Sequence, residues 1–182
     1  RLLTLFTTWG VCACMMERGH VLNGRDALIG EIGHMQISGC PEKLCGCGKR
    51  HCLESAVRLD HLHQLLMAEK ASWLEQEPLT FQSLFTHSRQ GDPAARKIVE
   101  YLARCYASAL HNLSLCYNQE AVVFQGDMAW ADPYFDQCLK RELDEFRYYP
   151  EGEWLTTRYD RRELSTLAAR GDAALLRKKY FA

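Results

Sequence analysis

The sequence predicts an α/β domain in which a mixed sheet is flanked by helices. Apolar segments of strand length are interspersed with longer segments in which apolar residues recur every three or four positions. The first strands follow one another through short turns, whereas the later strands are separated by helices. Short turns suit antiparallel neighbours and helical connections suit parallel ones, so the sheet should contain both kinds of pairing.

The chain opens with three predicted strands. Residues Leu2–Thr8 and Val11–Glu17 are largely apolar and are separated by Trp9-Gly10. Arg18-Gly19 is typical of a hairpin turn and leads into a short strand over His20–Leu22. A three-stranded meander is therefore expected, followed by an irregular, glycine-rich and cysteine-rich segment.

Helices dominate the middle of the chain. Ser55 to about Glu69 carries leucines on one face, and Phe81–Arg89 predicts a second, short helix. Asp92-Pro93 is a strong helix start, because Asp caps the N-terminus and Pro suits the first turn. A long buried helix that ends near Asn118 is predicted by one stripe: Ile98, Leu102, Cys105, Ala109, Leu113 and Cys116.

The last third of the sequence returns to alternation. Ala121–Asp127 is a predicted strand that leads into a glycine turn, and Asp132-Pro133 opens the next helix. "EWLTTRY" (Glu153–Tyr159) is the last predicted strand. Residues Glu163–Phe181 are predicted to be helical, with an interruption at Gly171-Asp172.

Length and charge limit what the chain is expected to do. Its 182 residues suit one compact domain or one lobe of a larger protein, and its formal net charge is −1. It has no basic stripe for nucleic acid, no signal peptide, and no apolar run of the roughly 18 residues that a membrane span needs. Because it begins inside a predicted strand and without Met, we expect a fragment with a preceding domain absent.

Cysteine is unusually frequent and is concentrated in one segment. Four of the nine cysteines lie with two histidines between Gly33 and Glu54. An odd count disfavours a secreted disulfide scaffold, and the length permits a core without cross-links, so a cytosolic protein that uses thiolates for metal fits better. For the cysteines in predicted strands and helices, small buried hydrophobes are the expected role: Cys12, Cys14, Cys105, Cys116 and Cys138.

The segment offers a ligand set for a tetrahedral zinc site. His34, Cys45, Cys47 and Cys52 supply one imidazole and three potential thiolates. The one-residue spacing of Cys45 and Cys47 is tighter than in common zinc fingers, and Cys40 and His51 are spare candidates. Reduced cysteines in a loop are the alternative, whereas a disulfide knot would need an oxidising compartment.

The run "GEIGHMQI…CGCGKRHCLE" closely resembles the signature of the ROK family, which comprises repressors, uncharacterised reading frames and sugar kinases. The family pattern is G-E-x-G-H followed, some ten residues later, by C-x-C-G-x-x-G-C-x-E. The matching residues here are Gly30, Glu31, Gly33, His34, Cys45, Cys47, Gly48, Cys52 and Glu54. One position departs, because His51 stands where the family usually has Gly. The order of strands and helices downstream is also similar to that of the family's C-terminal lobe.

The resemblance implies a fold and a site. The fold is an actin-like ATPase, or ribonuclease H-like, lobe, so residues 1–182 form a single C-terminal lobe with a zinc loop at about 33–54. Structural Zn²⁺ would be held by His34, Cys45, Cys47 and Cys52. Glu31, His34 and Glu54 would face sugar hydroxyls, which suits carboxylates as acceptors; solvated loop charges are the alternative. His34 could bind zinc through one ring nitrogen and a ligand through the other.

The nucleotide side of the family pattern is degraded. Between the first two strands, kinases of the family have a run similar to G-T-G-x-G-x-G. At these seven positions this sequence has Thr8, Trp9, Gly10, Val11, Cys12, Ala13 and Cys14. Phosphate cradles rely on backbone N–H groups that no side chain obstructs, and only the middle glycine, Gly10, remains. A second difference lies at the end of the strand predicted over Ala121–Asp127. Such kinases have a run similar to G-G-G there, and this sequence has Gln125-Gly126-Asp127. The acidic side chain of Asp127 would be unfavourable beside a phosphate.

The chain is therefore interpreted as the sugar-binding lobe of a ROK-type transcriptional regulator, with a sugar or sugar phosphate as effector. The resemblance implies a cytoplasmic protein that forms a homodimer or higher homo-oligomer and contacts DNA only through an absent N-terminal winged helix-turn-helix domain. No catalytic residue is assigned, because the expected catalytic Asp would precede residue 1. Two alternatives stay open: the C-terminal lobe of an ATP-dependent kinase for a hexose or amino sugar, and a zinc-stabilised oligomerisation lobe without a ligand.

Overall fold

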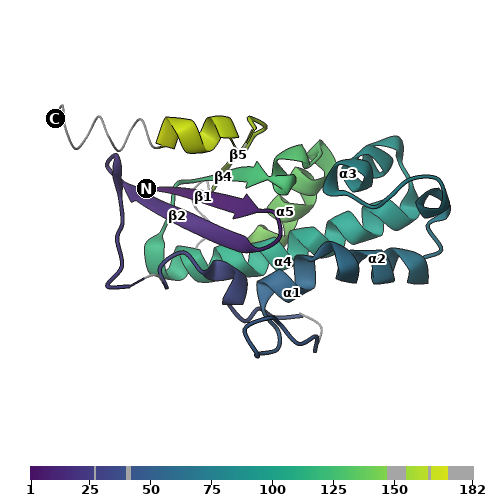
Figure 1. Cartoon of the computed structure of the whole chain (residues 1–182), viewed down its shortest axis with the longest axis horizontal. Coiled ribbons are helices and arrows are strands. Elements are labelled where there is room, and N and C mark those ends of the chain that lie inside the picture. The colour runs from purple at the N-terminus through teal and green to yellow at the C-terminus, as the bar shows by residue number, and fades with distance from the viewer. Residues whose placement is uncertain (27, 40–41, 147–154, 164, 172–182) are drawn as a thin grey trace.

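A five-stranded mixed sheet organises the chain, as predicted (Figure 1). The computed structural model describes residues 1–26, 28–39, 42–146, 155–163 and 165–171. The strand order is β3-β2-β1-β4-β5, in which the pairs among the first three strands are antiparallel and β1–β4 and β4–β5 are parallel. The strand bounds are β1 Leu2–Thr7, β2 Val11–Glu17, β3 His20–Val21, β4 Ala121–Gly126 and β5 Thr156–Asp160.

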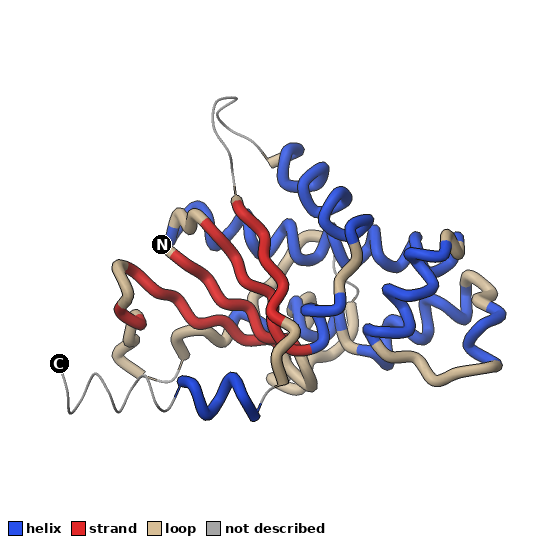
Figure 2. The backbone as a smooth tube through the Cα atoms, turned by 90° about the horizontal axis from the view of Figure 1, so that it is seen from above, coloured by secondary structure: helices blue, strands red, loops and turns tan. Residues whose placement is uncertain are grey.

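The labelled helical elements of the described part are five α-helices and three short 3₁₀ turns. The α-helices are α1 Leu53–Val57, α2 Leu59–Ala68, α3 Phe81–Gln90, α4 Pro93–Tyr117 and α5 Pro133–Glu145. The 3₁₀ turns are η1 Ile32–His34, η2 Ser72–Glu75 and η3 Asp127–Trp130, and a further helical segment covers 165–171. Figure 2 shows α4 crossing behind the twisted sheet, with α2 and α3 beyond its end.

The core lies between one face of the sheet and helices α4 and α5. Alternate residues of the central strands, such as Leu5 and Phe124, point to this face and are fully buried. Tyr106 of α4 and Phe135 of α5 meet Phe124 edge to face, and the Tyr106 hydroxyl lies 2.9 Å from Thr7 Oγ1. Each fully buried side chain of this size contributes about 1.5–3 kcal/mol, so this layer fixes the sheet that carries the site.

The two predicted Asp-Pro helix starts are confirmed. Asp92 and Asp132 each cap a helix by accepting a hydrogen bond from the backbone N–H three residues on, at 2.8 Å in both cases. Asn118 ends α4 in the left-handed conformation, with φ +51°. The long helix therefore begins and ends where the sequence indicated.

Other predicted boundaries differ. The helix predicted over 55–69 is two helices, because Arg58 has an extended backbone (ψ 141°) and separates α1 from α2. The last strand begins at Thr156, and residues 153–154 lie outside the described part. Of the helix predicted over 163–181, residues 165–171 are helical, and the remainder of that prediction from residue 172 on also lies outside the described residues.

Burial contradicts part of the prediction for the cysteines. Cys105 and Cys138 are buried as expected, but Cys12 and Cys116 are exposed and Cys14 is only half-buried. The register with β1 puts Cys12 and Cys14 opposite Phe6 and Thr4, on the sheet face away from α4 and α5. Strand membership alone does not decide which face is covered.

Among the described residues, no helix combines the length and apolar character needed to cross a membrane.

Candidate metal centre and ligand pocket

Two short antiparallel contacts shape the segment after β3. The Ile37 N–H donates to the His51 carbonyl at 3.0 Å, and the Leu53 N–H donates to the Met35 carbonyl at 2.9 Å. Between these bonds, Gln36 and Cys52 form an isolated bridge. The pairing brings the residue that follows η1 beside the start of α1, although the two are far apart in the sequence.

A tight turn then presents the first two cysteines. The Gly48 N–H donates to the Cys45 carbonyl at 2.9 Å, and the Cys45 N–H donates to the Lys49 carbonyl at 2.8 Å. Gly48 has φ +82°, a conformation that glycine adopts without steric cost. The turn lets two thiols one residue apart reach one centre, which is the spacing that common zinc fingers lack.

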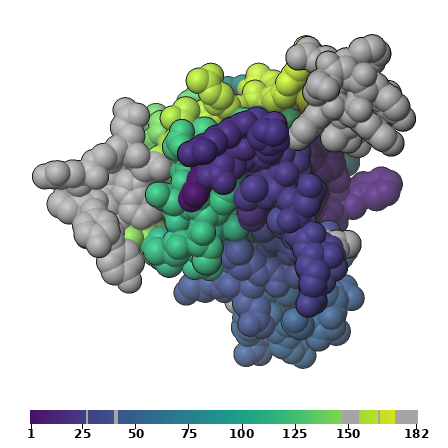
Figure 3. Space-filling view, turned by 90° about the vertical axis from the view of Figure 1, so that its left-hand side faces the viewer, coloured from purple at the N-terminus to yellow at the C-terminus, as the bar shows by residue number. Residues whose placement is uncertain are grey.

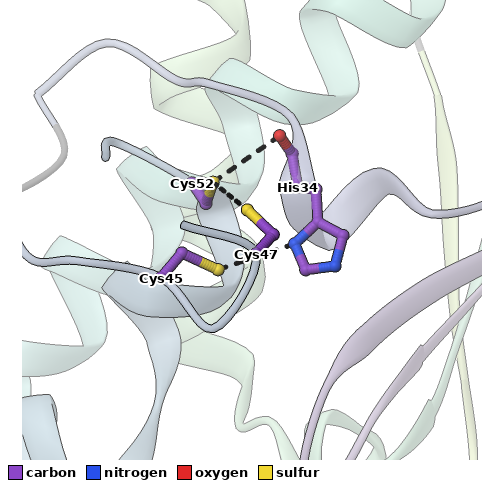
Figure 4. Close-up of side chains that lie close together, drawn as sticks. All are labelled: His34, Cys45, Cys47 and Cys52. Carbon is purple, nitrogen blue, oxygen red and sulfur yellow. Dashed lines mark hydrogen bonds between the residues drawn. The ribbon is translucent and has the colours of Figure 1, made fainter. Parts of the chain in front are cut away.

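Four candidate ligands converge in this loop (Figure 4). One ligand atom from each of His34, Cys45, Cys47 and Cys52 lies within 4.8 Å of all the others. His34 Nδ1 lies 3.5 Å from Cys45 Sγ, and Cys47 Sγ lies 3.7 Å from Cys52 Sγ. Cys45 and Cys52 are buried, His34 is half-buried and Cys47 is exposed.

These separations fit a tetrahedral zinc ion. With Zn–S near 2.3 Å and Zn–N near 2.0–2.1 Å, a tetrahedron places two sulfurs about 3.8 Å apart and a sulfur and a nitrogen about 3.5 Å apart. The observed S···S separation of 3.7 Å and N···S separation of 3.5 Å match these edges. The donor set of three thiols and one imidazole is also one that zinc takes, so the residues fit a structural zinc site.

The thiols differ in how readily they ionise without a cation. Burial raises the pKa of Cys52 to about 12, and the neighbouring thiols of Cys47 and Cys45 reinforce that shift. The Lys49 backbone N–H lowers the pKa of Cys47. A divalent cation would remove the penalty on a buried thiolate, and its binding would release protons.

The glycines of the G-E-x-G-H motif are needed because the loop packs directly on the edge of β2. A Cβ on Gly30 would lie 2.1 Å from the Ala13 carbonyl oxygen, and one on Gly33 would lie 2.5 Å from that of Val11. The Ala13 N–H also donates to the Gly30 carbonyl at 2.8 Å. The loop is thus seated on the strand, and Glu31 and His34 are held by it.

Glu31 and His34 line a common pocket of about 460 Å³. His34 Nε2, the ring nitrogen directed away from the sulfurs, lies 4.0 Å from Glu31 Oε2. The rest of the lining includes two residues that the sequence motif contains, Gly30 and Cys47, and four that the sequence prediction did not assign to the site: Leu28, Ile32, Met35 and Lys49. Lys49 had a signal, since it lies inside the cysteine motif, but Leu28 and Met35 are set by the folding of the loop alone.

Glu54, the third predicted sugar contact, lies between the cysteine loop and the β1–β2 turn. Its Oε2 accepts the Val11 N–H at 3.3 Å, and its Oε1 lies 4.0 Å from Cys45 Sγ. Oε2 would also be 2.9 Å from a Cβ at Gly10. Glu54 therefore contacts the predicted phosphate turn, and it is not among the residues that line the pocket of Glu31 and His34.

The degraded phosphate turn is compact. The Thr8 N–H donates to the Gly10 carbonyl at 3.0 Å, and Trp9 between them is 97% exposed. Its indole thus projects outward instead of covering the turn. Cys12 and Cys14 lie further along β2, on the face that α4 and α5 leave uncovered.

Asp127 follows β4 and shares a pocket with Thr8 of the β1–β2 turn. With Thr8, Gly126, Trp130 and Arg161 it lines a second pocket, of about 270 Å³. Burial raises the pKa of the Asp127 carboxyl. Gly126 has φ +68°, and a Cβ there would lie 2.2 Å from the Thr7 carbonyl oxygen, so β4 and β1 meet closely where Asp127 leaves the sheet.

The two spare candidates have different outcomes. His51 is absent from the described metal cluster and adopts φ +65°. Cys40 lies outside the described residues. In the view of Figure 3, the surface near residue 50 (blue) forms the lower end of the molecule. The last described residues (yellow-green) lie at its upper end.

Comparison with known proteins identifies the same family that the sequence motif indicated. Residues 2–179 match the sequence profile of the ROK family. The chain is 27% identical to the N-acetylglucosamine repressor of Escherichia coli O6:H1 over 76% of this chain and 36% of the repressor. It is 30% identical to the N-acetylmannosamine kinase of Yersinia pestis over 71% of this chain and 42% of the kinase. It therefore spans less than half the length of these curated relatives.

A solved structure extends the likeness to three dimensions. The ROK hexokinase of Thermus thermophilus superimposes with a TM-score of 0.65 and 26% identity, covering 86% of this chain and 51% of the hexokinase. The predicted actin-like ATPase fold, with a mixed sheet flanked by helices, is confirmed.

Proposed function

Because this chain belongs to the ROK family, we propose that it is the carbohydrate-binding lobe of a sugar-responsive transcriptional regulator that has lost phosphotransfer. The relatives include both kinds of protein, a repressor and sugar kinases. The proposal therefore rests on a contrast within the sequence motifs: the motif with the proposed metal ligands and sugar contacts matches the family pattern except at His51, and the glycines of the phosphate turn are largely replaced.

The metal part of the proposal assigns one structural Zn²⁺ to His34, Cys45, Cys47 and Cys52. Bound there, the ion supplies charge neutralisation for the thiolates and a fixed centre for the loop. The 3.5 Å approach of Cys45 Sγ to His34 Nδ1 supports Nδ1 as the ligand atom. That choice leaves Nε2 protonated and free to donate a hydrogen bond on the side of Glu31.

The ligand part assigns sugar hydroxyls to Glu31 and His34. Carboxylate oxygens accept hydrogen bonds from vicinal hydroxyls, and the Nε2–H of His34 donates to a hydroxyl oxygen. The shared pocket of about 460 Å³ supports this pairing. Glu54 is proposed as a third contact, through whichever lone pairs the Val11 N–H leaves free.

The loss of phosphotransfer is supported by the β1–β2 turn. The Val11 N–H, which a phosphate cradle would direct at phosphate, donates to the Glu54 carboxylate at 3.3 Å. Asp127 adds a second carboxylate on the other side of the turn. Three glycines of the kinase pattern are replaced, by Thr8, Cys12 and Cys14, so side chains stand where a phosphate cradle needs a bare backbone; Arg161 and Arg162 line the pocket of Asp127 as well, so the altered glycines and not the net charge support the loss. This is the observation that carries the regulator proposal.

Partners follow from the same assignment. A sugar or sugar phosphate is the proposed effector, and a homodimer or higher homo-oligomer is the proposed assembly. Residues 1–182 would be the C-terminal lobe, and DNA would be bound through a separate N-terminal domain. The 30% identity to an N-acetylmannosamine kinase favours an ATP-dependent amino-sugar kinase as the second candidate.

Sugar binding by the full-length protein tests the proposal. Titration calorimetry of the zinc-loaded protein against N-acetylglucosamine, N-acetylmannosamine and glucose should show binding of at least one. Glu31→Gln should weaken that binding about tenfold or more, because it removes a charged acceptor. Glu75→Gln, on the remote turn η2, is the matched control and should bind like the wild type. No binding to any of the sugars, or unchanged affinity in Glu31→Gln, would contradict the proposal.

A further inference from the structure

Cys47 is the most accessible of the four proposed metal ligands. Its side chain is exposed, whereas Cys45 and Cys52 are 4% and 0% exposed and His34 is half-buried. Oxidation of a thiol depends on its access to solvent, because the oxidant must touch the sulfur. Among these four ligands, Cys47 is therefore the one that a small dissolved oxidant meets first.

A second thiol lies within reach of Cys47. The Sγ atoms of Cys47 and Cys52 are 3.7 Å apart and a disulfide bond needs about 2.05 Å, so the two must approach by about 1.7 Å. Gly46 and Gly48 flank Cys47, and a Cβ at either would meet no atom of the described residues within 4 Å. The turn that carries Cys47 thus has room to move, whereas Cys52 is buried at the start of α1.

Cys47 also belongs to the wall of the pocket that Glu31 and His34 line. The same residue thus serves the proposed ligand pocket and the proposed metal centre. His34 joins the two sites as well, because its Nδ1 lies 3.5 Å from Cys45 Sγ and its Nε2 lies 4.0 Å from Glu31 Oε2. A chemical change at Cys47 would therefore alter the pocket directly.

We propose that Cys47 is an oxidation site, at which a hydroperoxide joins Cys47 to Cys52 in a disulfide and opens the metal centre. This inference rests on the metal part of the proposed function. The Cys47 thiolate attacks one oxygen of hydrogen peroxide and breaks the O–O bond, which gives a sulfenic acid and a hydroxide that takes up a proton. The Cys52 thiolate then attacks the Cys47 sulfur and, with a second proton, displaces the sulfenic oxygen as water. Two thiolates lose two electrons, and the peroxide and two protons become two water molecules.

The disulfide leaves only His34 and Cys45 of the four ligands. Because zinc takes thiolates and not disulfide sulfurs, the centre no longer holds its ion, and His34 loses the anchor that orients its ring. A reductant restores both thiols and lets the ion bind again. Ligand binding thereby depends on the oxidation state of the loop.

Zinc release from the full-length, zinc-loaded protein tests the proposal. Hydrogen peroxide should release about one zinc per chain to a chromogenic chelator, and peptide mapping by mass spectrometry should find Cys47 joined to Cys52. Dithiothreitol with added zinc should reverse both changes. Cys116→Ser removes an exposed thiol outside the loop and should release zinc at the wild-type rate.

A second variant separates metal binding from oxidation. Cys47→His offers zinc another ligand but cannot form the disulfide, so peroxide should release its zinc about tenfold more slowly or less. Release at the wild-type rate, or a disulfide of Cys52 with Cys45 in the wild type, would overturn the inference. If Cys47→His holds no zinc, the peptide map of the wild type decides alone.

The effect on the pocket is measured by titration calorimetry of the oxidised protein. Its affinity for the sugar that the reduced protein binds should fall about tenfold or more. Unchanged affinity would overturn the link between oxidation and the pocket. If zinc stayed bound under peroxide while Glu31→Gln still weakened sugar binding, the proposed function would stand without this inference. If the wild type held no zinc when purified, the metal assignment and this inference would fall together.

Discussion

His51 occupies a backbone conformation that disfavours most side chains. Its φ of +65° lies in the left-handed region, where a residue with a Cβ pays about 1–2 kcal/mol and glycine pays almost nothing. This accounts for the glycine in the family pattern at this position. We expect His51→Gly to raise the free energy of unfolding by about 0.5–1 kcal/mol in urea titrations. Lys49→Gly, at a neighbour without positive φ, should lower it by a similar amount. Destabilisation by His51→Gly would contradict the backbone argument.

Asp127 should make stability depend on pH in a defined direction. Burial raises the pKa of its carboxyl, so the folded state holds this proton more tightly than the unfolded state does. Its ionised form therefore lowers stability at pH 7, and this cost disappears as the pH falls below the ordinary aspartate pKa of about 3.9. Asp127→Asn should be more stable than the wild type at pH 7, with the difference lost near pH 3.

Asp136 provides the opposite case for the same measurement. Burial opposes its ionisation, but hydrogen bonds from Lys140 and Thr157 prevail and lower the pKa of its carboxyl. Asp136→Asn should therefore be less stable than the wild type at pH 7, by an amount that shrinks as the pH falls. Urea unfolding of both variants at pH 7 and pH 3 distinguishes the two signs. Equal responses would show that burial at Asp127 does not matter.

At the scale of elements, the loop that carries Glu31 and His34 depends on close contact with β2. A methyl group at Gly30 would collide with the Ala13 carbonyl at 2.1 Å, in addition to the strain of φ +89°. Gly30→Ala should cost about 2–4 kcal/mol in unfolding free energy. Gly39→Ala is the matched control, because Gly39 has φ +73° but no atom of the described residues contacts the place where the new methyl group would lie. Only the backbone strain of about 1 kcal/mol should therefore appear.

The cysteine loop should depend on its metal while the helical core does not. We expect about one zinc per chain by elemental analysis, lost in Cys47→Ser and retained in Cys116→Ser, whose site is exposed on α4. Removing the ion with a chelator should speed amide exchange at Ile37, Cys45 and Leu53, whose N–H groups are bonded within the loop. Exchange in the middle of α4 should not change. Metal-free protein with an unaltered loop would contradict a structural role.

Elements with local signals were predictable, and those set by packing were not. The Asp92 and Asp132 caps fix helix starts through their own side chains, so the sequence was sufficient there. The break at Arg58 has no glycine or proline to mark it, and α1 and α2 on either side of it both pack against α4. The exposure of Cys12 likewise depends on which sheet face the helices cover, which the strand pattern alone does not reveal.

At the scale of the whole molecule, the mixed sheet brings three distant segments to one end. The β1–β2 turn, the end of β4 with Asp127, and the start of α1 with Glu54 meet around Gly10 and Thr8. The metal ligands could be read from their spacing and the family pattern. The bond from Val11 to Glu54 could not, since it joins residues 43 positions apart that only the folded chain brings together. That bond joins Glu54, a proposed sugar contact, to the turn that corresponds to the phosphate loop of the family's kinases.

The central claim is that this site binds sugar without transferring phosphate. Its most direct test is ADP formation by the full-length, zinc-loaded protein with Mg²⁺-ATP, with and without a sugar that calorimetry has shown to bind. We predict no increase in ADP on addition of the sugar and no phosphorylated sugar in the products. Sugar-stimulated ADP formation with a matching amount of sugar phosphate would contradict the account and identify a kinase.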